Sequence, residues 1–108
     1  MMYMMRLGIE DMRREDLLDA AKEITKGHRE EHYGSPEDNF QNIANLWSTY
    51  LHDKVISAED VAVMMILMKA ARLKSDITHV DSWIDIAGYA ACGCEIVTKG
   101  KVDNAHVA

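Results

Sequence analysis

The sequence predicts an all-α protein, a four-to-five-helix bundle that assembles as a homo-oligomer. Apolar residues recur at steps of three and four over four long segments, and no run of residues alternates cleanly over the length of a strand. Pro36 is the only proline, so little interrupts these segments. A chain of 108 residues forms one domain with a small core, and short helical subunits often share part of their core with a partner.

A single helical domain is expected over residues 15–98. Residues 1–14 would form an N-terminal segment that docks on a partner subunit. Its methionine-rich start is apolar, but Arg6 ends it after too few residues for a targeting or membrane-spanning segment. Residues 99–108 are expected to form a flexible tail.

The first two helices are predicted from apolar stripes and end signals. One face of residues 15–32 carries Leu17, Ala21, Ile24 and His28. The second helix begins at Ser35, an N-cap, with Pro36 at the first helical position and Asp38 at a capping-box position. An apolar stripe follows until the polar run over residues 52–54, which breaks the helix.

The third helix, predicted over residues 57–73, is apolar nearly all round. Ser57 and Asp60 have capping-box spacing at its start. From Val61 to Met68 it carries no polar side chain, and a helix without a polar face needs cover on all sides. A four-helix monomer of this size hardly supplies that cover, which predicts a homodimer or tetramer.

The fourth helix is predicted over residues 79–98, with Thr78 as its cap and Asp81 three residues on. Its middle is rich in small residues, namely Ala87, Gly88, Ala90, Ala91 and Gly93. Small side chains allow another helix, or a ligand, to approach the backbone closely.

The composition limits the partners. The formal net charge is −6 and the isoelectric point is about 5.2, so no basic excess exists to bind a nucleic-acid polymer. A small anionic ligand needs only two or three well-placed cations. Cys92 and Cys94 are two apart on a helix and point to different faces, which argues against a disulfide between them. Reduced thiols predict a cytoplasmic protein with no membrane partner.

Lys69 and Arg72 interrupt the apolar third helix, and their spacing of three places them side by side. Cations suit the end of a helix, where long stems reach solvent. The functional alternative is a phosphate clamp, with Arg72 as a two-pronged donor and Lys69 as a point charge.

Asp81 and Asp85 are four apart, so their carboxylates share a face of the fourth helix. Paired carboxylates one turn apart suit a hard divalent cation such as Mg²⁺. Asp81 also fits a capping box, whereas Asp85 lies one turn further in with nothing local to cap. A buried aspartate needs a partner, and Lys69 or Arg72 would serve structurally.

Weaker candidates lie in the first two helices. Ionisable residues that prolong or adjoin the first apolar stripe are His28, Glu30 and Glu31. An exposed helix end explains them equally well. Residues whose amides or ring could recognise a base are Tyr33, Asn39 and Asn42.

Two parts of the chain resemble a family of small phage and prophage proteins of unassigned function. The first is HYGSPEDNF followed by IANLW, and the second is KAARL followed by DSWIDIAGYA. The resemblance covers about residues 15–98. That family in turn resembles the MazG-like all-α nucleoside triphosphate pyrophosphohydrolases and the phage nucleotide-modification-associated domains.

The resemblance implies a magnesium site built from E-x-x-E and E-x-x-D motifs on adjacent helices. There Mg²⁺ holds the triphosphate while water attacks, releasing a nucleoside monophosphate and pyrophosphate. Residues 81–85 resemble the second motif, but Asp81 stands one residue early, giving D-x-x-x-D. The third helix lacks the E-x-x-E pair, so Glu59 or Asp60 at its start, or Glu30 and Glu31, would have to complete the set.

Two functions follow as hypotheses. The first is a Mg²⁺-dependent hydrolase of nucleoside or deoxynucleoside triphosphates in the phage or host nucleotide pool. Its catalytic residues would be Asp85, Asp81 and Glu31, its metal ligands Asp85, Asp81, Glu30, Glu31 and Asp60, and its substrate-binding residues Lys69, Arg72, Tyr33, Asn39, Asn42 and His28.

The alternative is a non-catalytic protein on the same scaffold that sequesters a phosphorylated signal made by host defence, in the host cytoplasm. A structural or interaction helix bundle that binds no small ligand is the third possibility. Three or more carboxylates near Asp85 would favour the enzyme, and Asp85 paired with Lys69 or Arg72 would favour the binding protein.

Overall fold

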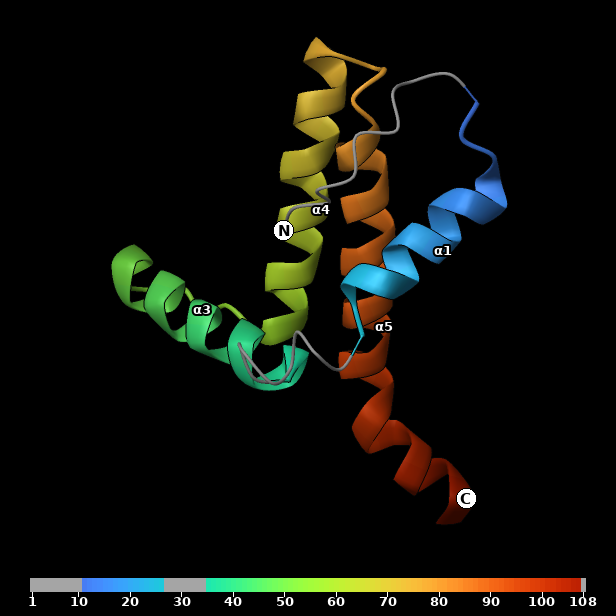
Figure 1. The fold of residues 1–108 in the computed structure, drawn as a ribbon. Coiled ribbons are helices and arrows are strands. Elements are labelled where there is room, and N and C mark those ends of the chain that lie inside the picture. The colour runs from blue at the N-terminus through green and yellow to red at the C-terminus, as the bar shows by residue number, and fades with distance from the viewer. Residues whose placement is uncertain (1–10, 27–34, 108) are drawn as a thin grey trace.

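The computed structural model describes residues 11–26 and 35–107, with side chains described as far as residue 99. These residues form four α-helices and no strand, which confirms the all-α prediction (Figure 1). The helices are α1 (Arg14–Ile24), α3 (Pro36–Leu51), α4 (Ala58–Ser75) and α5 (Val80–Val107). Within the described ranges, no helix combines the length and the apolar character that crossing a membrane requires.

The two longest helices, α4 and α5, form an antiparallel pair joined by a turn of four residues (Figure 1). Short connections of this kind hold successive helices side by side. The helix α1 packs on α5, whereas α3 packs mainly on α4 near its start. The described residues therefore form a helical hairpin, with α1 packed on the α5 side and α3 on the α4 side.

The predicted starts of the second and third helices are confirmed. The Ser35 hydroxyl accepts a hydrogen bond from the Asp38 amide at 3.1 Å. Ser57 and Asp60 form a reciprocal capping box, with N···O distances of 3.1 and 3.0 Å. Each cap satisfies amide groups that the first turn of a helix leaves without partners. The predicted break after the second helix is also confirmed, because His52 ends α3 with a φ of 69°.

The first helix is shorter than predicted. It ends at Ile24 rather than near residue 32, although residues 27–34 lie outside the described residues. The Thr25 hydroxyl donates to the carbonyl oxygens of Ala21 and Lys22 at 3.1 and 3.0 Å. A side-chain donor that satisfies the last carbonyl groups takes the place of a further helical turn.

The ends of the fourth helix also differ from the prediction. Its cap is His79 and not Thr78, because the His79 ring lies 3.2 Å from the Ser82 amide while Thr78 bonds to Asp76. The helix was expected to end near residue 98, but α5 continues to Val107. Gly100 does not end it and no proline follows, so nothing in this segment forces the chain out of helix.

Most of the buried apolar residues among the described residues fall into two clusters. One joins α3, α4 and α5 and contains Phe40, Ala44, Ala58, Val61, Ala62, Tyr89 and Cys92. The other joins α1 to α5 and contains Ala20, Ala21, Ile24 and Ile84. In the first cluster a Cβ added at Gly93 would lie 3.0 Å from the Ala62 Cβ. The small residues of α5 thus allow the close approach of α4 that the sequence predicted.

Candidate functional site

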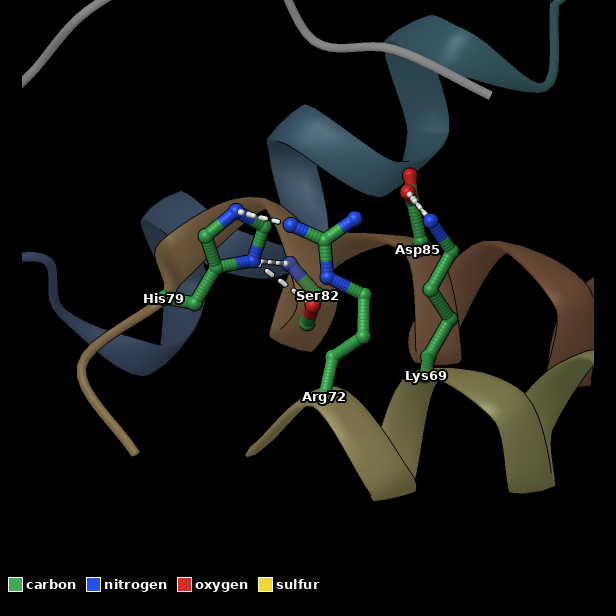
Figure 2. Close-up of polar contacts among 5 residues, drawn as sticks. All are labelled: Lys69, Arg72, His79, Ser82 and Asp85. Atoms are coloured by element: carbon green, nitrogen blue, oxygen red, sulfur yellow. Dashed lines mark hydrogen bonds and ion pairs between the residues drawn. The ribbon is translucent and has the colours of Figure 1, made fainter. Parts of the chain in front are cut away.

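The second half of the contact between α4 and α5 is polar, in contrast to the first. Figure 2 shows the five side chains concerned, which we call the polar seam: Lys69 and Arg72 of α4, His79 at the cap position before α5, and Ser82 and Asp85 of α5. Their spacing explains why they meet. Residues three apart on a helix share a face, and in the antiparallel pair the two faces oppose each other.

The innermost pair of the polar seam is Lys69 and Asp85. The Lys69 Nζ atom lies 3.1 Å from Asp85 Oδ2, and the exposed fractions of the two side chains are 11% and 1%. Although the contact is at ion-pair distance, neither Asp85 oxygen accepts a well-directed hydrogen bond among the described residues. Asp85 therefore has the buried cationic partner that the sequence required, and it keeps unused acceptor capacity.

The outer part of the polar seam joins Arg72 to His79 and Ser82. Arg72 Nη2 lies 3.4 Å from His79 Nε2, and His79 Nδ1 lies 2.7 Å from the Ser82 hydroxyl oxygen (Figure 2). Ser82 is fully buried, whereas Arg72 is exposed. No carboxylate among the described residues pairs with Arg72, so its charge remains available to a ligand.

The tautomer of His79 decides what this arrangement can bind. A neutral imidazole has one N–H donor and one acceptor nitrogen. If Nδ1–H donates to the Ser82 hydroxyl, Nε2 accepts from Arg72. If Nδ1 instead accepts from Ser82, Nε2–H and the Arg72 guanidinium are both donors that face each other. An anion between them would then accept from both, as phosphate oxygens do with arginine.

The turn between α4 and α5 holds His79 in position. Asp76 Oδ1 accepts hydrogen bonds from the Thr78 hydroxyl at 2.7 Å and from the Thr78 amide at 3.1 Å. These bonds to Thr78 lower the pKa of Asp76 below its ordinary value, because they stabilise the charged carboxylate. The turn carries His79 directly to the first turn of α5.

An apolar cavity lies next to the polar seam. It has a volume of about 280 Å³ and is lined by Met12, Leu17, Thr78, Val80 and Trp83. The Trp83 ring is fixed because its Nε1–H donates to the Ile77 carbonyl oxygen at 2.9 Å. Thr78 and Val80 flank His79 in sequence, so the cavity lies close to His79, although neither His79 nor Arg72 lines it. Half-exposed Trp83 presents an aromatic surface there.

The candidate metal ligands are only partly brought together. Asp81 lies on α5 one turn before Asp85, but Asp60 caps the start of α4. Nine residues separate Asp60 from Lys69, which is about 13 Å along a helix. Among residues 11–26 and 35–99, no group of three or more His, Cys, Asp or Glu side chains is placed to hold a metal ion. Glu30 and Glu31 lie outside the described residues.

The candidate base-recognition residues are separated from the polar seam where they are described. Asn39 and Asn42 lie on α3, which packs against the first turns of α4 around Ala58 and Val61. Lys69 is eight residues beyond Val61, about 12 Å along the helix. The third base-recognition candidate, Tyr33, and the predicted substrate-binding residue His28 lie outside the described residues.

Sequence reasoning missed His79 and Ser82. Both were assigned only to the start of a helix, and neither interrupts an apolar stripe. The available signal was the seven-residue interval from Arg72 to His79. This interval contains the last residues of α4 and the four-residue turn, so His79 comes to lie beside Arg72. That signal needs the exact end of α4, and helix ends are the least certain part of a sequence-based prediction.

Comparison with known proteins identifies relatives but no solved structure. The profile of the family described as "Domain of unknown function (DUF6378)" matches residues 16–97. The "Gene 55 protein" of Mycobacterium phage D29 is 50% identical over 78 residues, covering 72% of this chain and 51% of the phage protein. That of Mycobacterium phage L5 is 46% identical over 74 residues, covering 68% and 47%. The chain spans about half the length of these curated relatives, and no solved structure matches it.

Proposed function

We propose that this chain, which belongs to the family described as "Domain of unknown function (DUF6378)", binds a small phosphorylated ligand of the nucleotide class without hydrolysing it. The matched residues 16–97 include the whole polar seam. The proposed ligand places its phosphate between Arg72 and His79 and its base in the neighbouring apolar cavity.

The ion pair between Lys69 and Asp85 is the observation that carries this proposal. Its Nζ–Oδ2 distance is 3.1 Å, and Asp85 is almost completely buried. A lysine ammonium in contact with a carboxylate neutralises the charge that would otherwise attract a divalent cation. Asp85 paired with Lys69 is the arrangement that favours a binding protein over a metal-dependent hydrolase.

The cations that remain suit phosphate. Arg72 offers a planar set of N–H donors and pairs with no carboxylate among the described residues. His79 lies 3.4 Å away at the N-terminus of α5, where the backbone amides and the helix dipole favour negative charge. A phosphate at this point accepts hydrogen bonds from both side chains.

The cavity beside His79 suits the base. Its volume of about 280 Å³ is small for a whole nucleotide, because ligand pockets usually range from about 300 to 1,000 Å³. It is sufficient for a planar ring system, which would stack on Trp83. A phage protein that held a nucleotide in this way would lower the free concentration of that nucleotide in the host.

Magnesium-dependent hydrolysis of nucleoside triphosphates is the second candidate. It is favoured by Asp85, whose two buried oxygens accept no well-directed hydrogen bond among the described residues. Asp81 stands one turn away on the same face. In this mechanism these carboxylates, with Glu30 or Glu31, would hold Mg²⁺, and Lys69 would have to move from Asp85 to the phosphates. The D-x-x-x-D spacing of Asp81 and Asp85, which resembles a MazG-like metal-binding motif, is the sequence feature in favour of this candidate.

Isothermal titration calorimetry tests the first proposal. The probes are ribonucleoside and deoxyribonucleoside mono- and triphosphates, titrated first in EDTA and then in Mg²⁺. We expect at least one to bind in EDTA. Arg72→Ala should weaken that binding about tenfold or more, because a hydrogen bond to a charged group contributes about 1.5–3 kcal/mol. Lys54→Ala removes the same charge at an exposed position away from the seam and should leave binding unchanged.

Chromatography of the same mixtures separates the two candidates. Binding without new products supports the binding protein. Monophosphate and pyrophosphate that form only with Mg²⁺, and are lost in Asp85→Asn, would establish the hydrolase instead. If no nucleotide binds, or if Arg72→Ala binds as tightly as the parent protein, the proposed site is wrong. Circular dichroism of each variant confirms that it remains folded.

A further inference from the structure

The face of α4 that points away from α5 is apolar and exposed. The exposed fractions of Val63 and Leu67 are 54% and 61%, and Met64 and Met68 are also exposed. Large exposed side chains that form a continuous stripe mark interaction surfaces. Since the sequence predicted that α4 needs cover on all sides, the uncovered stripe identifies the side on which that cover is missing.

Two pairs of residues on this side of α4 lie at equal intervals before and after Leu67. Asp60 and Lys74 stand seven residues before and after it, and Val63 and Ala71 stand four residues before and after it. Positions at these intervals fall on one side of a helix, because two turns take about seven residues. All five residues are exposed.

We propose that α4 binds α4 of a second copy of this chain, antiparallel, about a twofold axis at Leu67. In a twofold interface residue i meets residue j and j meets i. Asp60 then faces the partner subunit's Lys74, which has the opposite charge. Val63 faces the partner subunit's Ala71, so a larger side chain meets a smaller one and the helices can approach closely. The two helix dipoles also run in opposite directions.

The same pairing excludes the parallel arrangement. In a parallel, in-register pair, Asp60 would face the partner subunit's Asp60 and Lys74 would face the partner subunit's Lys74. Like charges placed directly opposite each other destabilise an interface. Charge complementarity therefore selects both the occupant, a second copy, and its direction.

This surface is independent of the proposed nucleotide site. Lys69 lies on the buried side of α4 against α5, whereas Leu67 lies on the opposite side, two residues away and about 200° around the helix. A single pair of helices buries less surface than a standard interface of about 1,600 Å². We therefore expect a dimer in the micromolar range that forms with or without ligand.

Sedimentation velocity of the full chain over roughly 1–200 µM measures the association. We expect the mass to rise with concentration from the 12.2 kDa of the monomer towards twice that value. Leu67→Glu should raise the dissociation constant at least about a hundredfold, because two glutamates then meet on the axis. Leu18→Glu is the matched control, since Leu18 is 62% exposed on α1, and it should leave the dissociation constant unchanged.

Cross-linking tests the direction and the axis. In a Cys94→Ser background, Leu67→Cys should join two copies through a short bifunctional maleimide, because the two thiols meet on the axis. Ala71→Cys should not, because an antiparallel pair separates these positions by eight residues, about 12 Å.

Three results would overturn the proposal. The first is a parent protein that stays monomeric at the highest concentration, which would indicate that another segment of the chain covers the stripe. The second is a Leu67→Glu protein that still dimerises as the parent does. The third is cross-linking at position 71 as efficient as at 67, which would indicate a parallel pair. Circular dichroism of Leu67→Glu confirms that loss of the dimer is not loss of the fold.

Discussion

The two halves of the contact between α4 and α5 are built from opposite chemistry. In the first half, Gly93 lies against Ala62 so closely that an added Cβ would be 3.0 Å away. In the second half, buried Lys69 meets buried Asp85 at 3.1 Å. Close apolar contact stabilises a helix pair through dispersion attraction and through the removal of apolar surface from water. A buried ion pair often contributes little net stability, because both charges lose their hydration.

This difference suggests that the apolar half of the contact serves stability and that the polar half serves another function. The apolar half already joins α3, α4 and α5 in one cluster. A hairpin of this kind could continue with apolar residues to the turn, and nothing in helix packing calls for the charges of the polar seam. A ligand site would explain why these charged residues lie in the polar half of the contact.

The largest expected effect comes from breaking the buried ion pair. Lys69→Met leaves Asp85 without its cation, and removal of one partner of a buried pair costs about 3–5 kcal/mol. Lys69→Met with Asp85→Leu removes both charges, keeps the branched shape of the aspartate side chain and shortens the lysine side chain by one heavy atom. It should recover most of that loss. Urea denaturation of the three proteins measures the free energies of unfolding. If the double variant is as unstable as the single one, the pair is a source of stability and the contrast drawn above is wrong.

The next effect comes from the apolar half. Gly93→Val adds atoms where the Ala62 Cβ already lies at contact distance, and overpacking of this kind costs about 1–3 kcal/mol. Cys94→Val is the matched control, because Cys94 is the exposed neighbour on the same helix. Thermal denaturation should show a lower melting temperature for the first variant only. Equal melting temperatures for the two variants would mean that α4 and α5 can move apart at Gly93 without loss of stability.

A smaller effect is expected at the turn that positions His79. Asp76→Ala removes the carboxylate that accepts both hydrogen bonds from Thr78, so His79 should be less well fixed beside Arg72. Nucleotide affinity should fall, but by less than in Arg72→Ala, because Asp76 does not itself meet the phosphate. Calorimetry compares the two variants. An affinity unchanged from the parent would show that the position of His79 does not depend on this turn.

The smallest effect concerns an ion pair between α3 and α5, far from the polar seam. Lys99 Nζ lies 3.1 Å from Glu37 Oε2. A hydrogen bond from its own backbone amide, and then Lys99, lower the pKa of Glu37 below its ordinary value of 4.5. Because Lys99 is largely exposed, Glu37→Gln should cost only about 0.2–1 kcal/mol at neutral pH.

The pH dependence of that variant has a definite sign. A carboxyl group with a lowered pKa contributes stability that is complete above 4.5 and is lost as the pH falls through its folded-state pKa. The difference between the parent and Glu37→Gln should therefore be largest near neutral pH and disappear in acid. Melting temperatures measured from pH 7 to pH 3 test this. A difference that grew in acid would contradict the assignment, and Glu95→Gln on the exposed side of α5 is the control.

Several elements could be predicted from the sequence because their causes are local. Ser35 and Ser57 are followed at the right interval by the residues that complete their caps, so the starts of α3 and α4 needed no tertiary information. The end of α1 could not be predicted in the same way. A threonine in a helical pattern either continues the helix or bonds back to its last carbonyl groups, and Thr25 does the latter.

For the candidate site, too, neighbours on one helix could be predicted from the sequence, whereas contacts between helices could not. Spacing alone placed Lys69 beside Arg72 and Asp81 beside Asp85, because each pair lies on a single helix. Which cation meets Asp85 depended on the register of α4 against α5. Asp60 seemed an available metal ligand from sequence, but its carboxylate accepts the Ser57 amide at 3.0 Å in the capping box.

The sequence by itself determined that this protein is helical, where α3 and α4 begin, and that charged groups would enter an apolar contact. Periodicity and caps depend on residues that are close in sequence, so they can be recognised from the sequence alone. Only the tertiary structure decided that Lys69 neutralises Asp85, that His79 returns beside Arg72, and that the stripe around Leu67 stays uncovered. These features depend on the register and relative rotation of packed helices, which are set by contacts between residues distant in sequence.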